Sequence, residues 1–202
     1  MFLKSPHSLI LASTSVYRRE LLSRLKIPFE CRAPGVDETP LSGETAVALV
    51  ARLAVAKAEA IAIQNPHAWV IGSDQVAVLA QGTAGEAILG KPGSVENCVE
   101  QLKMCSGRTL SFITAVAVLR QRDASRVEFI DTTRVSYRSL DEATIRRYVA
   151  QESPLDCAGG FKSEGLGIAL CTSIDTTDVT GLVGLPLLRL SAVLRAAGFE
   201  IP

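Results

Sequence analysis

Carboxylates that could do chemistry stand at two places along this chain of 202 residues. Asp74 stands directly after the apolar run Trp69–Ser73, where a charge is costly unless it is paired or used. Asp37 and Glu38 lie together in a polar loop, where an ordinary turn is the alternative interpretation. Carboxylates are preferred ligands of Mg²⁺ and Mn²⁺, and a carboxylate beside a bound metal can orient and deprotonate water. Metal-assisted hydrolysis is therefore one chemistry that these carboxylates could perform.

Cationic and hydroxyl side chains suited to phosphate accompany these carboxylates. Ser13–Ser15, followed by Arg18 and Arg19, stands between the first predicted strand and the first predicted helix. Hydroxyls and main-chain N–H groups at a helix start suit a phosphate, and a guanidinium adds a charged grip. Lys57 and Lys91 could neutralise a polyphosphate. Taken singly, these residues are equally consistent with a helix cap and solvated surface cations, and no P-loop pattern is present.

A glycine-containing segment, Cys157–Gly165, is the third unusual feature. Glycine lets the main chain approach a ligand closely. If the segment is extended, Lys162 and Glu164 point to the same side of it. A surface loop without function is the alternative.

The periodicity of apolar residues predicts that strands alternate with helices early in the chain and that strands pair directly with each other in its middle. This pattern is typical of a mixed α/β sheet. Polar loops at strand ends, where such sheets bind ligands, would carry the candidate residues. Ser42 is expected to cap the second helix and Ser139 to open a capping box. We expect strands over residues 8–13, 29–33, 69–79, 109–120 and 127–137, and helices over 16–26, 45–64, 94–105, 140–151 and 186–198.

Composition excludes several classes of function. Twenty-one basic and 21 acidic residues give no net charge, so neither nucleic acid nor an anionic membrane is an expected partner. The five Cys are expected to be free and mostly buried, as in the cytoplasm. Met1–His7 carry no signal peptide, and no apolar stretch is long enough to span a membrane. With only two His and no zinc spacing, a Ser–His or Cys–His hydrolase and a zinc site are not expected.

Taken in order, these segments resemble the Maf family of nucleoside triphosphate pyrophosphatases, over roughly Leu9 to Leu194. The matching segments are Leu9–Ser15 with Arg18–Leu22, Val36–Glu38, Ala56–Ala58, Gly72–Gln75, Leu89–Pro92, Ala158–Gly159 with Phe161, and Gly184–Pro186.

The resemblance implies a single domain over residues 1–202, with an α/β fold like that of inosine triphosphatases and a central cleft between two lobes. It implies hydrolysis of a nucleoside triphosphate to a monophosphate and pyrophosphate with a divalent cation (Mg²⁺, Mn²⁺ or Co²⁺). A homodimer is left open. The implied roles are catalytic base and metal ligand for Asp74, metal ligand for Glu38, and phosphate binding for Ser13, Arg18, Lys57 and Lys91.

The branch of the family is indicated by Gln75 and by Lys162–Gly165, which look like the branch acting on 7-methyl-GTP. The positions tied to base choice map to Tyr17, Gln75 and Glu164. Methylation at N7 makes guanine cationic, so an aromatic face and a carboxylate both suit it. The alternatives are a Maf pyrophosphatase for dTTP, UTP or another modified nucleotide, and a nucleotide-binding regulator of cell division or septum formation.

Three positions depart from the family pattern. Val16 stands where the family usually has Pro, and Tyr17 stands where this branch often has Trp. Gly160 stands where a small residue other than Gly is common. Val16 in place of Pro is expected to loosen the neighbouring loop Ser13–Ser15, which would bind phosphate. Tyr17 in place of Trp leaves the preferred base less well defined than the type of reaction.

Overall fold

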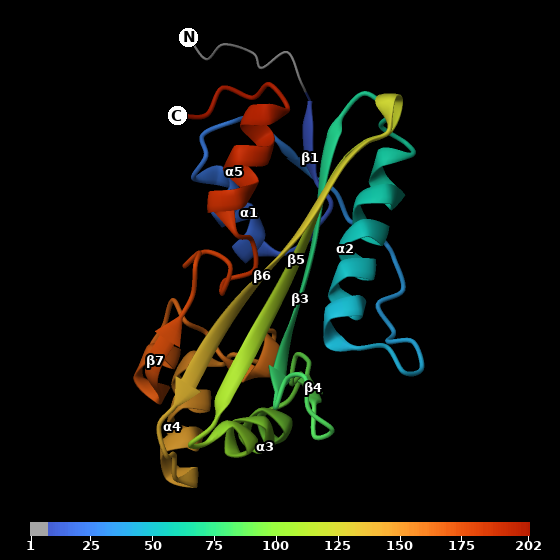
Figure 1. The fold of residues 1–202 in the computed structure, drawn as a ribbon. Helices are drawn as coiled ribbons and strands as arrows, with labels where there is room; N and C mark the ends of the chain where they lie inside the picture. Colours follow the sequence, from blue (N-terminus) through green and yellow to red (C-terminus); the bar gives the residue numbers. More distant parts are fainter. Residues whose placement is uncertain (1–7) are drawn as a thin grey trace. The chain divides into compact units, whose positions relative to one another are not determined.

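The computed structural model describes residues 8–202 and shows a mixed α/β fold (Figure 1). The expectation for Met1–His7 lies outside the described residues. Among residues 8–202, no helix has both the length and the apolar character required to cross a bilayer.

The strands are hydrogen-bonded in the order β2-β1-β3-β5-β6-β7, with β4 paired to β3. Strand β1 is parallel to β2 and β3, whereas β4 is antiparallel to β3 and β7 to β6. The mixed sheet expected from the sequence is therefore confirmed. The strands are β1 (Leu9–Leu11), β2 (Glu30–Cys31), β3 (Trp69–Leu79), β4 (Ala87–Leu89), β5 (Thr109–Arg120), β6 (Ser125–Tyr137) and β7 (Cys171–Asp175).

Five α-helices accompany these strands in the described part of the chain, close to the ranges expected from the sequence. They are α1 (Val16–Ser23), α2 (Ala46–Ala62), α3 (Val95–Cys105), α4 (Glu142–Glu152) and α5 (Leu187–Ala196).

The chain divides into two compact units, to which β3, β5 and β6 each contribute a part. The first unit contains residues 8–74, 114–131 and 178–202, and the second contains residues 75–113 and 132–177.

In the first unit, apolar side chains of β1, β3, β5 and β6 pack with those of α1 and α5. Leu11, Ile71 and Val118 are inaccessible to solvent, as is Leu190 of α5. This cluster accounts for the apolar periodicity of both helices, and it fixes the end of β1, after which Ser13 lies. Asp74 does not lie at a strand end as expected, because β3 continues through it to Leu79.

In the second unit, helices α3 and α4 pack against each other. The ring of Phe161 lies 5.6 Å from that of Phe112 and 5.5 Å from that of Tyr137, measured between centroids. Since aromatic pairs at this separation are stabilising, Phe161 anchors the glycine-containing segment to the unit.

Several local predictions were wrong. Thr45, not Ser42, caps α2, and Asp141, not Ser139, caps α4. In both cases the residue next to the helix accepts the N–H three positions on, which the more distant Ser cannot do. Strands β4 and β7 were not predicted, because both are short and lack a clear alternation of apolar residues.

The five Cys are free, as expected, but only Cys98 and Cys105 are buried. Burial raises the pKa of Cys98 to about 11 and that of Cys105 to about 12, so both stay as thiols at neutral pH.

Candidate active site

Lys57 joins two of the predicted carboxylates in the first unit. Its Nζ lies 2.6 Å from Oδ1 of Asp74 and 2.7 Å from Oε1 of Glu38. The side chains of Lys57 and Asp74 are 6% and 9% exposed, whereas that of Glu38 is 59% exposed. Lys57 is thus not a solvated surface residue, and its one ammonium group forms ion pairs with two carboxylates.

The close approach of α2 to β3 produces this arrangement. A Cβ on Gly72 would lie 2.1 Å from the carbonyl oxygen of Ala54 and 2.7 Å from the main-chain nitrogen of Ala58. No side chain fits there, so only Gly lets the helix come so near the strand. Lys57, between those two helical residues, then reaches Asp74, two residues after Gly72.

The environment of Asp74 changes its acidity. Burial raises the pKa of the Asp74 carboxyl, while the ammonium of Lys57 and the guanidinium of Arg18 act in the opposite direction. A carboxylate with a raised pKa is a stronger base than one in water, which suits proton transfer from water.

Arg18 is held near this cluster by the segment before α5. Its Nε donates to the carbonyl oxygen of Gly184 at 3.0 Å, and Ser73 Oγ donates to the same oxygen at 3.1 Å. Burial lowers the pKa of Arg18, and the charges of Asp74 and Glu38 oppose that shift. The guanidinium therefore lies near both carboxylates.

Ser13 and Ser15 form the turn between β1 and α1. Ser13 is buried, and its Oγ accepts the N–H of Ser15 at 3.1 Å. Ser15 caps α1 by accepting the N–H of Arg18 at 3.3 Å. The start of the helix thus has the N–H groups and hydroxyls that suit an anion, as the sequence indicated.

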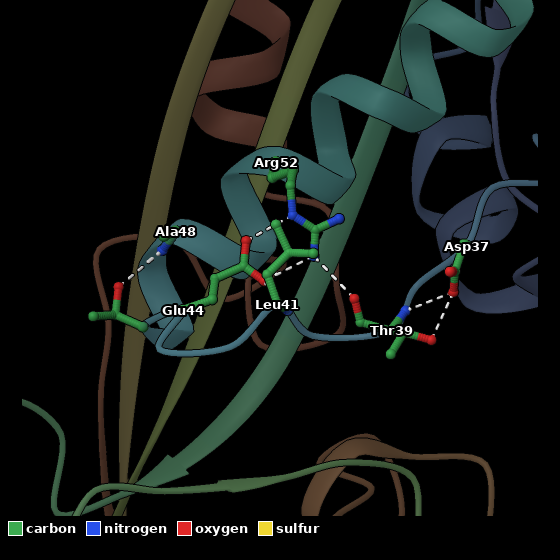
Figure 2. A network of polar contacts seen from close by, with 7 residues as sticks. Asp37, Thr39, Leu41, Glu44, Ala48 and Arg52 are labelled. Carbon is green, nitrogen blue, oxygen red and sulfur yellow. Dashed lines mark hydrogen bonds and ion pairs between the residues drawn. The ribbon is translucent and has the colours of Figure 1, made fainter.

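The loop that carries Glu38 is held on α2 by a network that the sequence did not reveal (Figure 2). Arg52 donates to both carboxylate oxygens of Glu44, at 2.6 and 2.7 Å, and to the carbonyl oxygen of Thr39 at 3.2 Å. Glu44 also accepts the N–H of Leu41 at 3.0 Å, and Asp37 accepts the N–H and hydroxyl of Thr39. These contacts fix the main chain on the C-terminal side of Glu38.

Asp178 is another residue that sequence reasoning missed. It is 4% exposed and accepts the N–H and hydroxyl of Thr180 and the N–H of Leu188. It thereby fixes the segment that leads to Gly184, whose carbonyl oxygen accepts from Arg18. The spacing Asp-x-Thr is typical of such a turn and could have indicated it.

The remaining predicted site residues are distributed between the two units. Tyr17 lies on α1 in the first unit. Gln75 follows Asp74 in β3, and Lys91 and Glu164, both exposed, lie in loops; all three belong to the second unit.

One prediction about the late segment was wrong. Lys162 and Glu164 do not lie on an extended stretch, because the carbonyl oxygen of Lys162 accepts the N–H groups of both Gly165 and Gly167. The segment is a tight turn, and Lys162 is paired with Glu152 at 2.8 Å.

Asp74 and Glu38 fit a divalent cation. Among residues 8–202, no group of three or more His, Cys, Asp or Glu side chains could hold a metal ion. Two carboxylates are nevertheless the usual protein contribution to a Mg²⁺ ion that also binds substrate phosphates. The two carboxylates meet at one cationic group in the structure, which shows that they can converge on a positive charge.

The family model described as Maf-like protein matches residues 8–197. The chain belongs to the Maf family. A 7-methyl-GTP pyrophosphatase of Polaromonas sp. is 53% identical to it, over 96% of this chain and 86% of that protein. Another from Pseudomonas aeruginosa is 52% identical, over 96% of this chain and 98% of that protein. The assignment from ordered motifs is thereby confirmed at the level of the family.

Among solved structures, that of the Ham1 protein of Staphylococcus aureus is similar to this Maf protein with a TM-score of 0.46 and 19% identity. The match covers 64% of this chain and 71% of that one. A likeness this distant carries no conclusion about function.

Proposed function

We propose that this Maf protein hydrolyses 7-methyl-GTP to 7-methyl-GMP and pyrophosphate, and that both units act together as one catalytic domain. The observation that carries the proposal is the cluster of Lys57, Asp74 and Glu38: two carboxylates that suit a cation, of which the buried one, Asp74, also suits the role of base. The names of relatives at 53% and 52% identity, over nearly the whole chain, support the choice of substrate.

Asp74 acts as the catalytic base in this proposal. It accepts a proton from the water that attacks the α-phosphorus, the bond from that phosphorus to the bridging oxygen breaks, and pyrophosphate leaves. Its raised pKa favours proton acceptance. Glu38 and Asp74 would hold a divalent cation, which when bound supplies charge neutralisation for the phosphate oxygens. Mg²⁺, Mn²⁺ and Co²⁺ all suit such oxygen ligands.

Cationic side chains bind the triphosphate. Arg18 and Lys57 provide positive charge beside the catalytic carboxylate, and Ser13 provides a hydroxyl at the start of α1. Lys91 provides a further cation from the second unit. Such groups stabilise the charge that accumulates on the leaving pyrophosphate.

Three residues select the base. N7-methylguanine carries a positive charge, so the ring of Tyr17 and the carboxylate of Glu164 both attract it. Glu164 also accepts from the N1–H and amino groups of guanine, and Gln75 offers both a donor and an acceptor. UTP and dTTP have no charged base and lack this donor pair.

The test is a substrate panel with purified protein: 7-methyl-GTP, GTP, dTTP and UTP, each with Mg²⁺, Mn²⁺ or Co²⁺. Pyrophosphate and orthophosphate are measured separately. We expect pyrophosphate as the first product and the highest kcat/KM with 7-methyl-GTP. Orthophosphate as the first product contradicts attack at the α-phosphorus, and preference for dTTP or UTP contradicts the base assignment. Binding without turnover of any triphosphate contradicts enzymatic activity.

A further inference from the structure

The turn that carries Glu164 is fastened at both ends by one carboxylate from α4. Oε1 of Glu152 lies 2.8 Å from Nζ of Lys162, which precedes Glu164 by two residues. Oε2 of Glu152 accepts the N–H of Leu166, two residues after Glu164, at 2.7 Å. The side chain of Glu152 is only 13% exposed. Charge-assisted bonds of this kind are among the stronger polar contacts in proteins.

A second residue of α4 fastens the start of the same turn. The hydroxyl of Tyr148 accepts the N–H of Lys162 at 3.0 Å and donates to the carbonyl oxygen of Gly160 at 3.1 Å. Tyr148 is buried and lies four residues before Glu152, on the same face of the helix. Four contacts thus attach the turn, and Gly160 before it, to helix α4.

Glycines allow the turn to close around the carboxylate. A Cβ on Gly165 would lie 2.5 Å from Oε2 of Glu152, and a Cβ on Gly167 would lie 2.4 Å from the carbonyl oxygen of Lys162. No larger residue fits at either position unless the neighbouring atoms shift. Both glycines follow Glu164, whose carboxylate is exposed and accepts from the hydroxyl of Ser163 at 3.0 Å.

We propose that Glu152 is a positioning residue for base selection: it holds the turn Lys162–Gly167 so that the carboxylate of Glu164 stays where it meets a cationic base. The inference rests on the proposed function, in which Glu164 contacts that base. Attraction between charges depends on their separation, and a group held in place loses less entropy when a ligand binds. A released turn therefore weakens recognition of the charged base while the phosphate chemistry continues.

The test compares variants of the two acidic residues at opposite ends of α4. Glu152→Ala removes both contacts, and Glu152→Gln keeps an acceptor for the N–H of Leu166 but loses the ion pair. Glu142→Gln is the matched control, because Glu142 pairs with Lys103 and Arg146 and does not touch the turn. For each variant, kcat and KM are measured with 7-methyl-GTP, GTP and UTP.

For Glu152→Ala we expect a KM for 7-methyl-GTP about tenfold higher, the size typical of losing a charge-assisted bond. We expect kcat for 7-methyl-GTP and both constants for UTP to change by less than about threefold. Glu152→Gln should be intermediate, and Glu142→Gln should match the wild type. Hydrogen exchange of the amides of 163–166 should be faster in Glu152→Ala than in Glu142→Gln, because the turn is released.

Two results would overturn the inference. One is unchanged preference for 7-methyl-GTP in Glu152→Ala when the wild type shows that preference. The other is an equal loss of kcat/KM with all three substrates together with a lower Tm, which indicates a structural role only. If the wild type itself does not hydrolyse 7-methyl-GTP, the proposed function fails first, and the substrate panel of the wild type alone reveals that outcome.

Discussion

The ammonium of Lys57 lies 2.6 Å from Oδ1 of Asp74, and both side chains are almost completely buried. Neither charge is tolerable alone in such a place, because a buried charge without a partner costs several kcal/mol. The pair is therefore a structural requirement as well as a candidate piece of catalytic machinery. Any variant of one residue has to be interpreted with the other in mind.

Replacing Lys57 tests the structural part of this relationship. Lys57→Met leaves Asp74 buried without its ammonium partner, and we expect the free energy of unfolding to fall by about 3 kcal/mol at neutral pH, as for other broken buried pairs. Urea unfolding followed by circular dichroism measures the change. Lys103→Met is the matched control: Lys103 pairs with Glu100 and Glu142 at the surface, so its loss should cost less than about 1 kcal/mol.

The cost of Lys57→Met should depend on pH. Burial already raises the pKa of Asp74, and removal of Lys57 raises it further. The folded variant then binds a proton that the unfolded chain has released, so its stability falls as pH rises between the unfolded and the folded pKa. We expect a smaller difference from the wild type at pH 4 than at pH 8. An equal difference at both pH values would show that the pKa of Asp74 does not depend on Lys57.

Replacing Asp74 tests whether this residue is the catalytic base. Asp74→Asn removes the base but keeps the shape of the side chain, and Lys57 still has Glu38 as a partner. We expect kcat to fall by about 10²–10⁴-fold, with a much smaller effect on Tm. Pyrophosphate release from 7-methyl-GTP and a thermal scan measure the two quantities.

Asp175→Asn is the control for that variant, because the side chain of Asp175 is 83% exposed and lies in β7 of the second unit. It should leave kcat and Tm close to wild type. Near-normal turnover in Asp74→Asn would remove Asp74 from the role of base and require another group to accept the proton.

The sequence predicted the long elements well, because they have clear apolar periodicity. Strands β3 and β5 and helices α3 and α5 lie within a residue or two of their expected ranges. Arg18, Glu38, Lys57 and Asp74 were candidates by type and position, and the resemblance to the Maf family implied their roles. The structure brings them together in the first unit.

What the sequence did not reveal depends on contacts between segments that are distant along the chain. Lys57 alone is typical of a surface lysine, and only the close packing at Gly72 explains its burial. The role of Glu44 could not be derived from helix spacing, because it precedes the helix that carries Arg52. Lys162 was expected on the same side of an extended segment as Glu164, whereas it pairs with Glu152 of a separate helix.

Gly72 provides a test of how closely α2 has to pack. Gly72→Ala forces the new Cβ against two main-chain atoms, neither of which is the end of a flexible side chain. We expect a loss of about 1–3 kcal/mol or more in unfolding free energy. We also expect lower kcat/KM, because a shifted helix moves Lys57 away from Asp74. Urea unfolding and steady-state kinetics measure the two effects.

Gly90→Ala is the control, since a Cβ on Gly90 would meet nothing within 4 Å. Its free energy of unfolding should stay within about 0.5 kcal/mol of wild type. If both alanine variants are equally stable, helix α2 tolerates displacement and the explanation of the buried lysine is wrong.

Arg52 provides the last test, because it is the centre of the network that holds the loop of Glu38 (Figure 2). The hydrogen bonds from Arg52 lower the pKa of Glu44 to about 2, so this contact stabilises the fold above the ordinary value of 4.5 and is lost as pH falls toward 2. Arg52→Met removes that contribution, and we expect the free energy of unfolding to depend less steeply on pH between 5 and about 2 than in the wild type.

Urea titrations at several pH values in this range measure that slope. Arg32→Met is the control, because Arg32 pairs with Glu30 at the surface. Identical slopes in all three proteins would show that the network does not stabilise the loop, and Glu38 would then have to be positioned by Lys57 alone.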